Sequence, residues 1–156
     1  MKHSIKAGVG FGVTSGIITT LGLIMGLASG TQSKAVVIAG IVTVAVADSL
    51  SDSLGIHVSE ESKNSRKKHT WTSAISATLS KFSVVMSFLV PLLLLEFFWA
   101  IAVSILWGSV MLGVFSYYMA VENNDTPWKV VGEHLLIAAI VVVITHYAGQ
   151  LVNLLV

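Results

Sequence analysis

Two aspartates, Asp48 and Asp52, lie one helical turn apart inside a segment that is otherwise apolar enough to cross a membrane. Side chains four positions apart share one face of a helix, so both carboxylates point the same way. A carboxylate near the centre of a bilayer costs about 2.5 to 3.5 kcal/mol on insertion scales. We expect no other charge to lie as deep. The pair needs a partner, a proton or a water-filled cavity, and is the first candidate for chemistry.

The same face continues as a polar stripe toward the end of the segment, through Ser51, Gly55 and Ser59. Carboxylates and hydroxyls in a row suit a path for a cation, which is the function we favour for the two aspartates. The alternative is structural: a buried pair that bonds to serine or histidine of neighbouring spans and shares one proton.

Two further groups could contribute oxygen or sulfur ligands. Ser15 and Thr19 lie in the first apolar segment, although hydroxyls in membrane helices usually bond back to their own turn. The thioether of Met86 would favour softer transition metals over calcium or magnesium, although methionine also fills gaps in packing. We rank these residues behind the aspartates.

The last apolar segment carries His134 and His146, and the second of these shares a face with Gln150 and Asn153. An imidazole inside a membrane could bind a metal ion or relay protons. It could equally donate a hydrogen bond across the helix packing. We keep both interpretations and include His146 among the second-rank metal ligands.

Acidic residues also mark the end of the second apolar segment, where Glu60 and Glu61 follow His57. They could form a mouth that recruits cations, and we include both glutamates among the candidate metal ligands. For His57 a solvated helix end is the simpler interpretation. Lys81 falls within the third span.

Composition restricts the class of protein. Of the 156 residues, 54% are hydrophobic and 11% are charged, which is more apolar surface than one small soluble core could bury. The chain should therefore be an integral membrane protein in contact with a lipid bilayer. The absence of cysteine excludes disulfides and thiolate metal sites. The few basic residues predict no nucleic-acid partner, and no catalytic motif indicates an enzyme.

Five segments are long enough to cross a bilayer, which takes about 20 residues as a helix. The expected architecture is a single all-α transmembrane domain, residues 1–156, with spans at about 7–29, 34–58, 71–95, 97–120 and 128–155. Pro91 lies near the end of the third span, where a free carbonyl can be tolerated.

Lysine and arginine predict the orientation, because cytoplasmic loops carry the excess of both. One side of the membrane receives most of the basic residues, namely Lys2, Lys6, Lys63, Arg66, Lys67, Lys68 and Lys129. The N-terminus should be cytoplasmic and the C-terminus on the opposite side.

Glycines recur every four residues in the first span, at 8, 12 and 16 and again at 22, 26 and 30. This spacing lets another helix approach closely. The contact could lie within the monomer, which we favour, or in a dimer.

The amino-acid sequence of the first hairpin resembles that of the vacuolar iron transporter family. The matching stretches are GFGVTSGIITTLGLIMGLAS (10–29), VIAG (37–40) and DSLSDSLGIHVSE (48–60), with a looser match at ITHYAG (144–149). The resemblance implies a five-helix homodimer with a cytoplasmic N-terminus and no tightly bound cofactor. It implies export of iron(II) or manganese(II) from the cytosol in exchange for protons.

The chain also departs from that family. Ser15 stands where the family usually has an aspartate, Asp52 where it has methionine, and Ile56 where it has glutamate. An acidic ligand lost from the first span could be replaced by Asp52, which would make the site harder. The short link between spans two and three lacks the family's cytoplasmic metal-binding domain, which fits a minimal prokaryotic member in the plasma membrane. Transport of another cation, or a structural or metal-sensing role without transport, are the alternatives.

Overall fold

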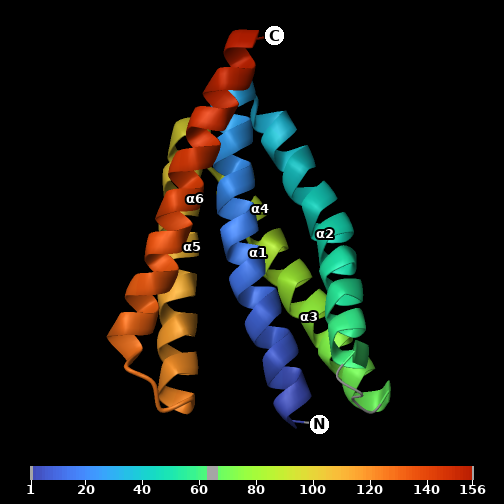
Figure 1. Ribbon diagram of the computed structural model, residues 1–156. Coiled ribbons are helices and arrows are strands. Elements are labelled where there is room, and N and C mark those ends of the chain that lie inside the picture. The colour runs from blue at the N-terminus through green and yellow to red at the C-terminus, as the bar shows by residue number, and fades with distance from the viewer. Residues whose placement is uncertain (1, 63–66, 156) are drawn as a thin grey trace.

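The computed structural model of the chain describes residues 2–62 and 67–155, and the described residues are helical with short turns (Figure 1). The helices are α1 (Lys2–Thr31), α2 (Lys34–Ser62), α3 (Lys67–Ser87), α4 (Leu89–Leu94), α5 (Phe97–Glu122) and α6 (Pro127–Leu155). Five stretches are long and apolar enough to cross a membrane, so the predicted all-α membrane architecture is confirmed. Lys63 and Arg66, on which the predicted orientation partly depends, lie outside the described residues.

The third span is interrupted, which gives six helices for five spans. It runs from His69 to Leu94 and breaks at Phe88, between α3 and α4. Pro91 has no N–H to offer the carbonyl of residue 87, and its ring crowds that carbonyl. Just before the proline, the helix also tightens: the Phe88 N–H bonds to the Val85 carbonyl, three residues back and not four, at 3.1 Å. The sequence predicted Pro91 near the span's end but not the break.

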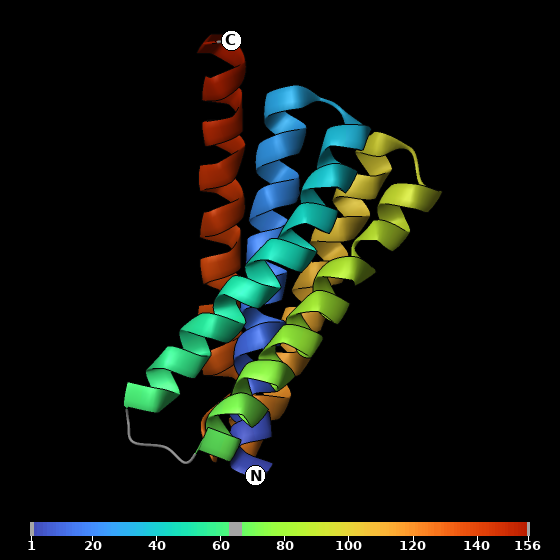
Figure 2. The ribbon, with the colours of Figure 1, turned by 90° about the vertical axis from the view of Figure 1, so that its right-hand side faces the viewer.

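The helices alternate in direction along the bundle. α1, α3 and α6 run one way, and α2 and α5 run the other, so the termini lie at opposite ends (Figures 1 and 2). The α1–α2 turn lies at the same end as the C-terminus, whereas the ends of α2 and α5 lie at the same end as the N-terminus (Figure 2). This arrangement follows from an odd number of spans.

The first helix occupies the middle of the bundle. α1 packs against α2 and α3 on one side and against α5 and α6 on the other (Figure 1). Its glycines make this possible: a Cβ at position 12 would lie 2.5 Å from the Ala77 carbonyl oxygen, and one at position 22 would lie 2.8 Å from a Val141 methyl group. The first glycine series therefore packs on α3 and the second on α6. Of the two contacts left open by the sequence, the one within the monomer is confirmed.

Candidate functional site

A buried lysine lies between the two aspartates. Lys81 Nζ, from α3, lies 2.5 Å from Oδ2 of Asp48 and 2.5 Å from Oδ2 of Asp52, both on α2. Ser15 Oγ, from α1, donates a hydrogen bond to Asp52 Oδ2 at 3.0 Å and accepts one from Lys81 Nζ at 3.0 Å. We call these four residues the charge centre; they join three helices.

The charge centre lies half-way along the spans that build it. Asp48 is the middle residue of the span Lys34–Ser62, and Lys81 is one of the two middle residues of His69–Leu94. At a rise of about 1.5 Å per residue, each group is far from either end of its helix. The expectation that no charge lies as deep as the aspartates is therefore wrong, because Lys81 lies at the same depth. The partner that the carboxylates required is this ammonium.

The three charges differ in burial. The Lys81 side chain is 1% exposed, whereas the side chains of Asp48 and Asp52 are 33% and 23% exposed. Two carboxylates share one ammonium, so the ionised centre carries one negative charge in excess. Apart from the Lys81 ammonium, no described residue donates a hydrogen bond to Asp48 Oδ2. The centre is thus enclosed around its cation but is still able to accept positive charge.

Close packing of α1 on α3 lets the lysine reach the aspartates. A Cβ at position 16 would lie 3.2 Å from Lys81 Cγ, so the glycine there leaves room for the lysine stem to pass between α1 and α3. Ala74 and Ala77, on the same side of α3, are also small and are buried. The small residues bring the three helices close enough for one ammonium to contact both carboxylates and a hydroxyl.

A cavity of about 480 Å³, with hydroxyl and carboxyl groups in its lining, extends from Asp52 toward the end of the bundle that carries the N-terminus. We call it the vestibule; its lining residues are Ala7, Phe11, Ser51, Asp52, Gly55, Ile56, Ser59, Glu60 and Ser73. It follows the polar stripe predicted on α2. Ser73 is 1% exposed, and its hydroxyl has no hydrogen-bond partner among the described residues. Asp52 and Glu60 are about 12 Å apart along the helix axis, so the vestibule connects mid-span to the helix end.

The opposite side of the charge centre is filled by large apolar side chains. Between the centre and the α1–α2 turn, the wholly buried large apolar residues of α1 to α4 are Ile17, Leu21, Ile24, Val37, Ile41, Val85, Phe88 and Leu92. We call this part of α1 to α4 the closed half, and the part that contains the vestibule the open half. The charge centre lies between them, with access from one side.

No protein-family model, curated protein or solved structure matches the chain. The ligands that the charge centre offers are two carboxylates and a hydroxyl, which are hard oxygen donors. In the described ranges, no three residues among histidine, cysteine, aspartate and glutamate cluster as a metal site.

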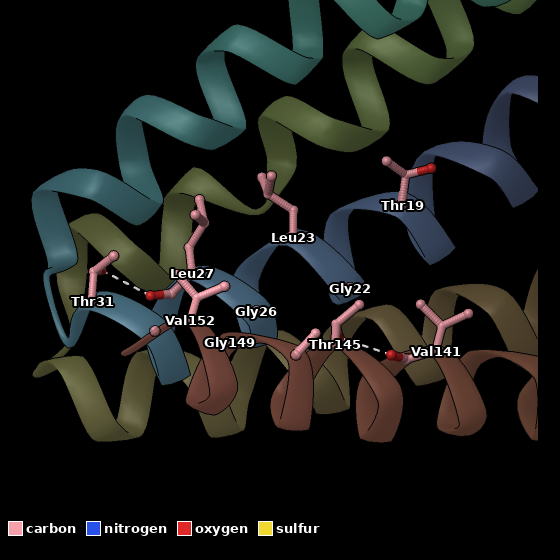
Figure 3. Close-up of a pocket in the computed structure, with 12 residues that line it drawn as sticks. Thr19, Gly22, Leu23, Gly26, Leu27, Thr31, Val141, Thr145, Gly149 and Val152 are labelled. Atoms are coloured by element: carbon pink, nitrogen blue, oxygen red, sulfur yellow. Dashed lines mark hydrogen bonds between the residues drawn. The ribbon is translucent and has the colours of Figure 1, made fainter. Parts of the chain in front are cut away.

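Thr19 and Met86 are not part of the charge centre. Thr19 lines an apolar groove of about 580 Å³ between α1 and α6, together with Leu23, Thr145 and Gly149 (Figure 3). The Thr145 hydroxyl there bonds back to the Val141 carbonyl at 2.8 Å (Figure 3). Met86 packs against the apolar core of the closed half. Thr19 lies one turn beyond Ser15 toward the α1–α2 turn, and neither Thr19 nor Met86 belongs to the charge centre.

The histidines of α6 make contacts elsewhere. His146 Nδ1 shares a hydrogen bond with Ser29 Oγ at 2.6 Å, and its Nε2 lies 3.1 Å from Gln150 Nε2. Ser29 is about 21 Å along α1 from Ser15, so His146 belongs to the far end of the bundle. His134 shares a hydrogen bond with Ser116 of α5 at 2.7 Å. Both histidines therefore make hydrogen bonds between packed helices, which is one of the two interpretations that the sequence left open.

The two glutamates at the end of α2 lie in different surroundings. Glu60 lines the vestibule, whereas Glu61 is exposed beyond it. His57 packs its ring against Trp71 of α3, with the ring centroids 4.5 Å apart. Of the predicted mouth, the structure brings one glutamate into the vestibule: Glu60 lies at its outer end and Asp52 at its inner end.

Lys81 is the site residue that sequence reasoning overlooked as a partner. The signal was present: a lysine in the middle of an apolar span is as costly as an aspartate there and needs an opposite charge. What the sequence did not show is which charge, because the pairing joins residues 29 and 33 positions apart on two helices.

Proposed function

We propose that the protein is a membrane transporter that moves a cation through the charge centre, with iron(II) or manganese(II) as the first candidates. The proposal depends on one observation: Asp48, Asp52 and Lys81 meet at mid-span, with the vestibule on one side and an apolar closed half on the other. A site in the middle of the membrane that opens to one side is the arrangement that alternating access requires.

A purely structural role explains the charge centre less well. In a bilayer, hydrogen bonds between neutral polar side chains can hold helices together without the cost of buried charges. A structural tie would also need one carboxylate, not two, and no cavity beside it. The second carboxylate and the vestibule therefore favour a group that exchanges with something outside the protein.

The donor set bears on which cation is carried. Carboxylate and hydroxyl oxygens bind iron(II) and manganese(II), and they also bind harder ions. Met86 and His146, the softer candidates, lie away from the centre. Transport of another hard cation is therefore the second candidate. Exchange for protons and export from the cytoplasm remain part of the proposal through the resemblance of the first hairpin, with the vestibule opening to the cytoplasm of a prokaryote.

A homodimer would complete the site. The Asp48 side chain is one-third exposed at mid-span, where lipid is a poor neighbour for a carboxylate. Beside it, toward the α1–α2 turn and outside the vestibule, α2 exposes a small residue at every fourth position, namely Ala35, Ala39, Thr43 and Ala47. Small residues at this spacing permit close packing of helices in membranes. We propose that a second copy covers this face.

The test is uptake of manganese(II) and iron(II) into proteoliposomes under an imposed pH gradient. We expect wild-type flux of at least one of these ions and little or none for Asp52→Asn, which leaves Asp48 to pair with Lys81 so that the fold is retained. Asp125→Asn, in the exposed α5–α6 turn, is the matched control and should transport normally. Absence of wild-type flux for both ions would reject the metal proposal; manganese binding without flux would favour a sensor.

A further inference from the structure

We propose that Lys81 is a built-in competitor of the transported cation, and that its ammonium occupies the carboxylates whenever the cargo is absent. This inference rests on the proposed function for its biological meaning. It goes further by assigning the lysine a role in selectivity: the cargo must be a cation that displaces an ammonium from two aspartates.

The ammonium and a metal ion cannot use the centre together. Lys81 Nζ contacts Oδ2 of Asp48, Oδ2 of Asp52 and Oγ of Ser15 at 2.5, 2.5 and 3.0 Å. Divalent cations bind oxygen ligands at about 2.0 to 2.6 Å, so an ion held by the same oxygens would lie where Nζ now lies. Binding of one therefore requires displacement of the other.

Displacement is possible because the lysine stem is long and the cavity is near. The side chain has four rotatable methylene groups, and Asp52 lines the vestibule. Water in that cavity could solvate an ammonium that has left the carboxylates. Ser73, whose buried hydroxyl has no partner among the described residues, lines the same cavity and could accept a hydrogen bond from it.

The competition sets a minimum affinity that a cation must have to occupy the centre, and that affinity depends on its charge. A monovalent cation gains from two carboxylates no more than the ammonium does, whereas a divalent cation gains about twice as much at the same distance. The tethered ammonium also has a high local concentration that a free ion must overcome. Lys81 therefore lowers the affinity for every cation by the same factor. A weakly bound monovalent ion then no longer occupies the site, whereas a more tightly bound divalent ion still does. When the cargo leaves, the returning ammonium neutralises one carboxylate.

The experiment is manganese(II) binding to the purified full chain in nanodiscs, followed by the electron paramagnetic resonance signal of free manganese. Lys81→Met should bind manganese at least about tenfold more tightly than wild type. Added sodium chloride should weaken binding in Lys81→Met but hardly in wild type, with choline chloride at the same ionic strength as the control for screening. Lys34→Met, which removes a lysine bonded to the Leu95 carbonyl at the far end of α2, should behave as wild type.

A second pair of variants guards against misfolding of Lys81→Met. Asp48→Asn and Asp48→Asn/Lys81→Met each retain one carboxylate of the charge centre, that of Asp52, and they differ only at the lysine. The double variant should bind manganese more tightly. Equal or weaker binding without Lys81 in folded protein, or no manganese binding by any variant, would overturn the competitor role. Tighter binding in Lys81→Met together with no wild-type flux in proteoliposomes would keep that role and reject transport.

Discussion

The two halves of the bundle that meet at the charge centre are built in opposite ways. In the open half, α1 and α3 pack through glycine, alanine and serine, and the vestibule remains beside α2. In the closed half, α1 to α4 pack through large apolar side chains such as Leu21, Ile41 and Phe88, all wholly buried. The centre can therefore be reached through one half and is sealed from the other.

This difference indicates which helix contacts would have to open during transport. An ion that enters from the open half can leave on the other side only if α2 or α3 separates from α1 in the closed half. The break at Phe88, between α3 and α4, lies within that apolar packing and is a natural place for the span to bend. Polar small-residue packing fixes the entrance, and apolar packing forms the seal.

Removal of both carboxylates should lower the free energy of unfolding the most, because the open and closed halves are joined at the charge centre. Asp48→Asn/Asp52→Asn leaves the Lys81 ammonium buried without a counter-charge, and we expect a loss of about 3 to 5 kcal/mol in unfolding free energy. Addition of Lys81→Met to this variant should restore most of the loss. Denaturant unfolding in detergent micelles would measure both, and a double variant as stable as wild type would contradict the pairing.

In the closed half, stability should depend on side-chain volume. Phe88→Ala removes a ring that is 0% exposed and should cost about 3 kcal/mol through the cavity that it leaves. Phe98→Ala, at a ring that is 73% exposed on the outer surface of α5, is the matched control and should cost much less. If the two substitutions lowered the unfolding midpoint equally, the apolar seal would not be a packed core.

In the open half, stability should depend on the absence of side-chain volume. Gly12→Ala places a methyl group against the Ala77 carbonyl and the Ser80 hydroxyl and should cost about 1 to 3 kcal/mol. Gly55→Ala, where nothing lies within 4 Å, should be neutral or slightly stabilising because alanine favours a helix. The same unfolding assay compares the two, and equal costs would show that α1 and α3 do not pack as closely as described.

The smallest effect is expected at the hydroxyl of the charge centre. Ser15→Ala removes hydrogen bonds to Asp52 and Lys81 but leaves both ion pairs, and should cost about 1 kcal/mol. Ser83→Ala on α3, whose hydroxyl bonds back to the Leu79 carbonyl of its own helix, serves as the control and should be near neutral. A loss at Ser15 as large as that of the double aspartate variant would mean that the hydroxyl, and not the charges, holds the helices together.

Much of the fold could be predicted from sequence because the signals are local. Hydropathy over about 20 residues locates the five spans, and the four-residue glycine spacing predicts close packing of α1. The spacing of Asp48 and Asp52 correctly places both on one face, where Lys81 contacts the two carboxylates. These features depend on neighbours along one helix.

The composition of the site could be predicted only in part, because it depends on how different helices rotate against each other. Thr19 is one turn from Ser15, yet it lines the apolar groove while Ser15 bonds to Asp52. Met86 and Lys81 are both on α3, but one packs in the apolar core and the other reaches the carboxylates. Hydropathy does not encode such rotations. The metal, the coupling to protons and the dimer remain predictions.

Accessibility of single cysteines to a membrane-impermeant thiol reagent would test most directly whether the charge centre opens to one side. The chain has no cysteine, so each introduced thiol is unique. Ser51→Cys in the vestibule should react from the N-terminal side only, whereas Ala45→Cys, at a position that is 0% exposed in the closed half, should not react from either side. Leu54→Cys, at a position 64% exposed on the outer face of α2, reports contact with lipid and should also stay unmodified. Equal reaction at positions 45 and 51, or none at 51, would contradict the one-sided site.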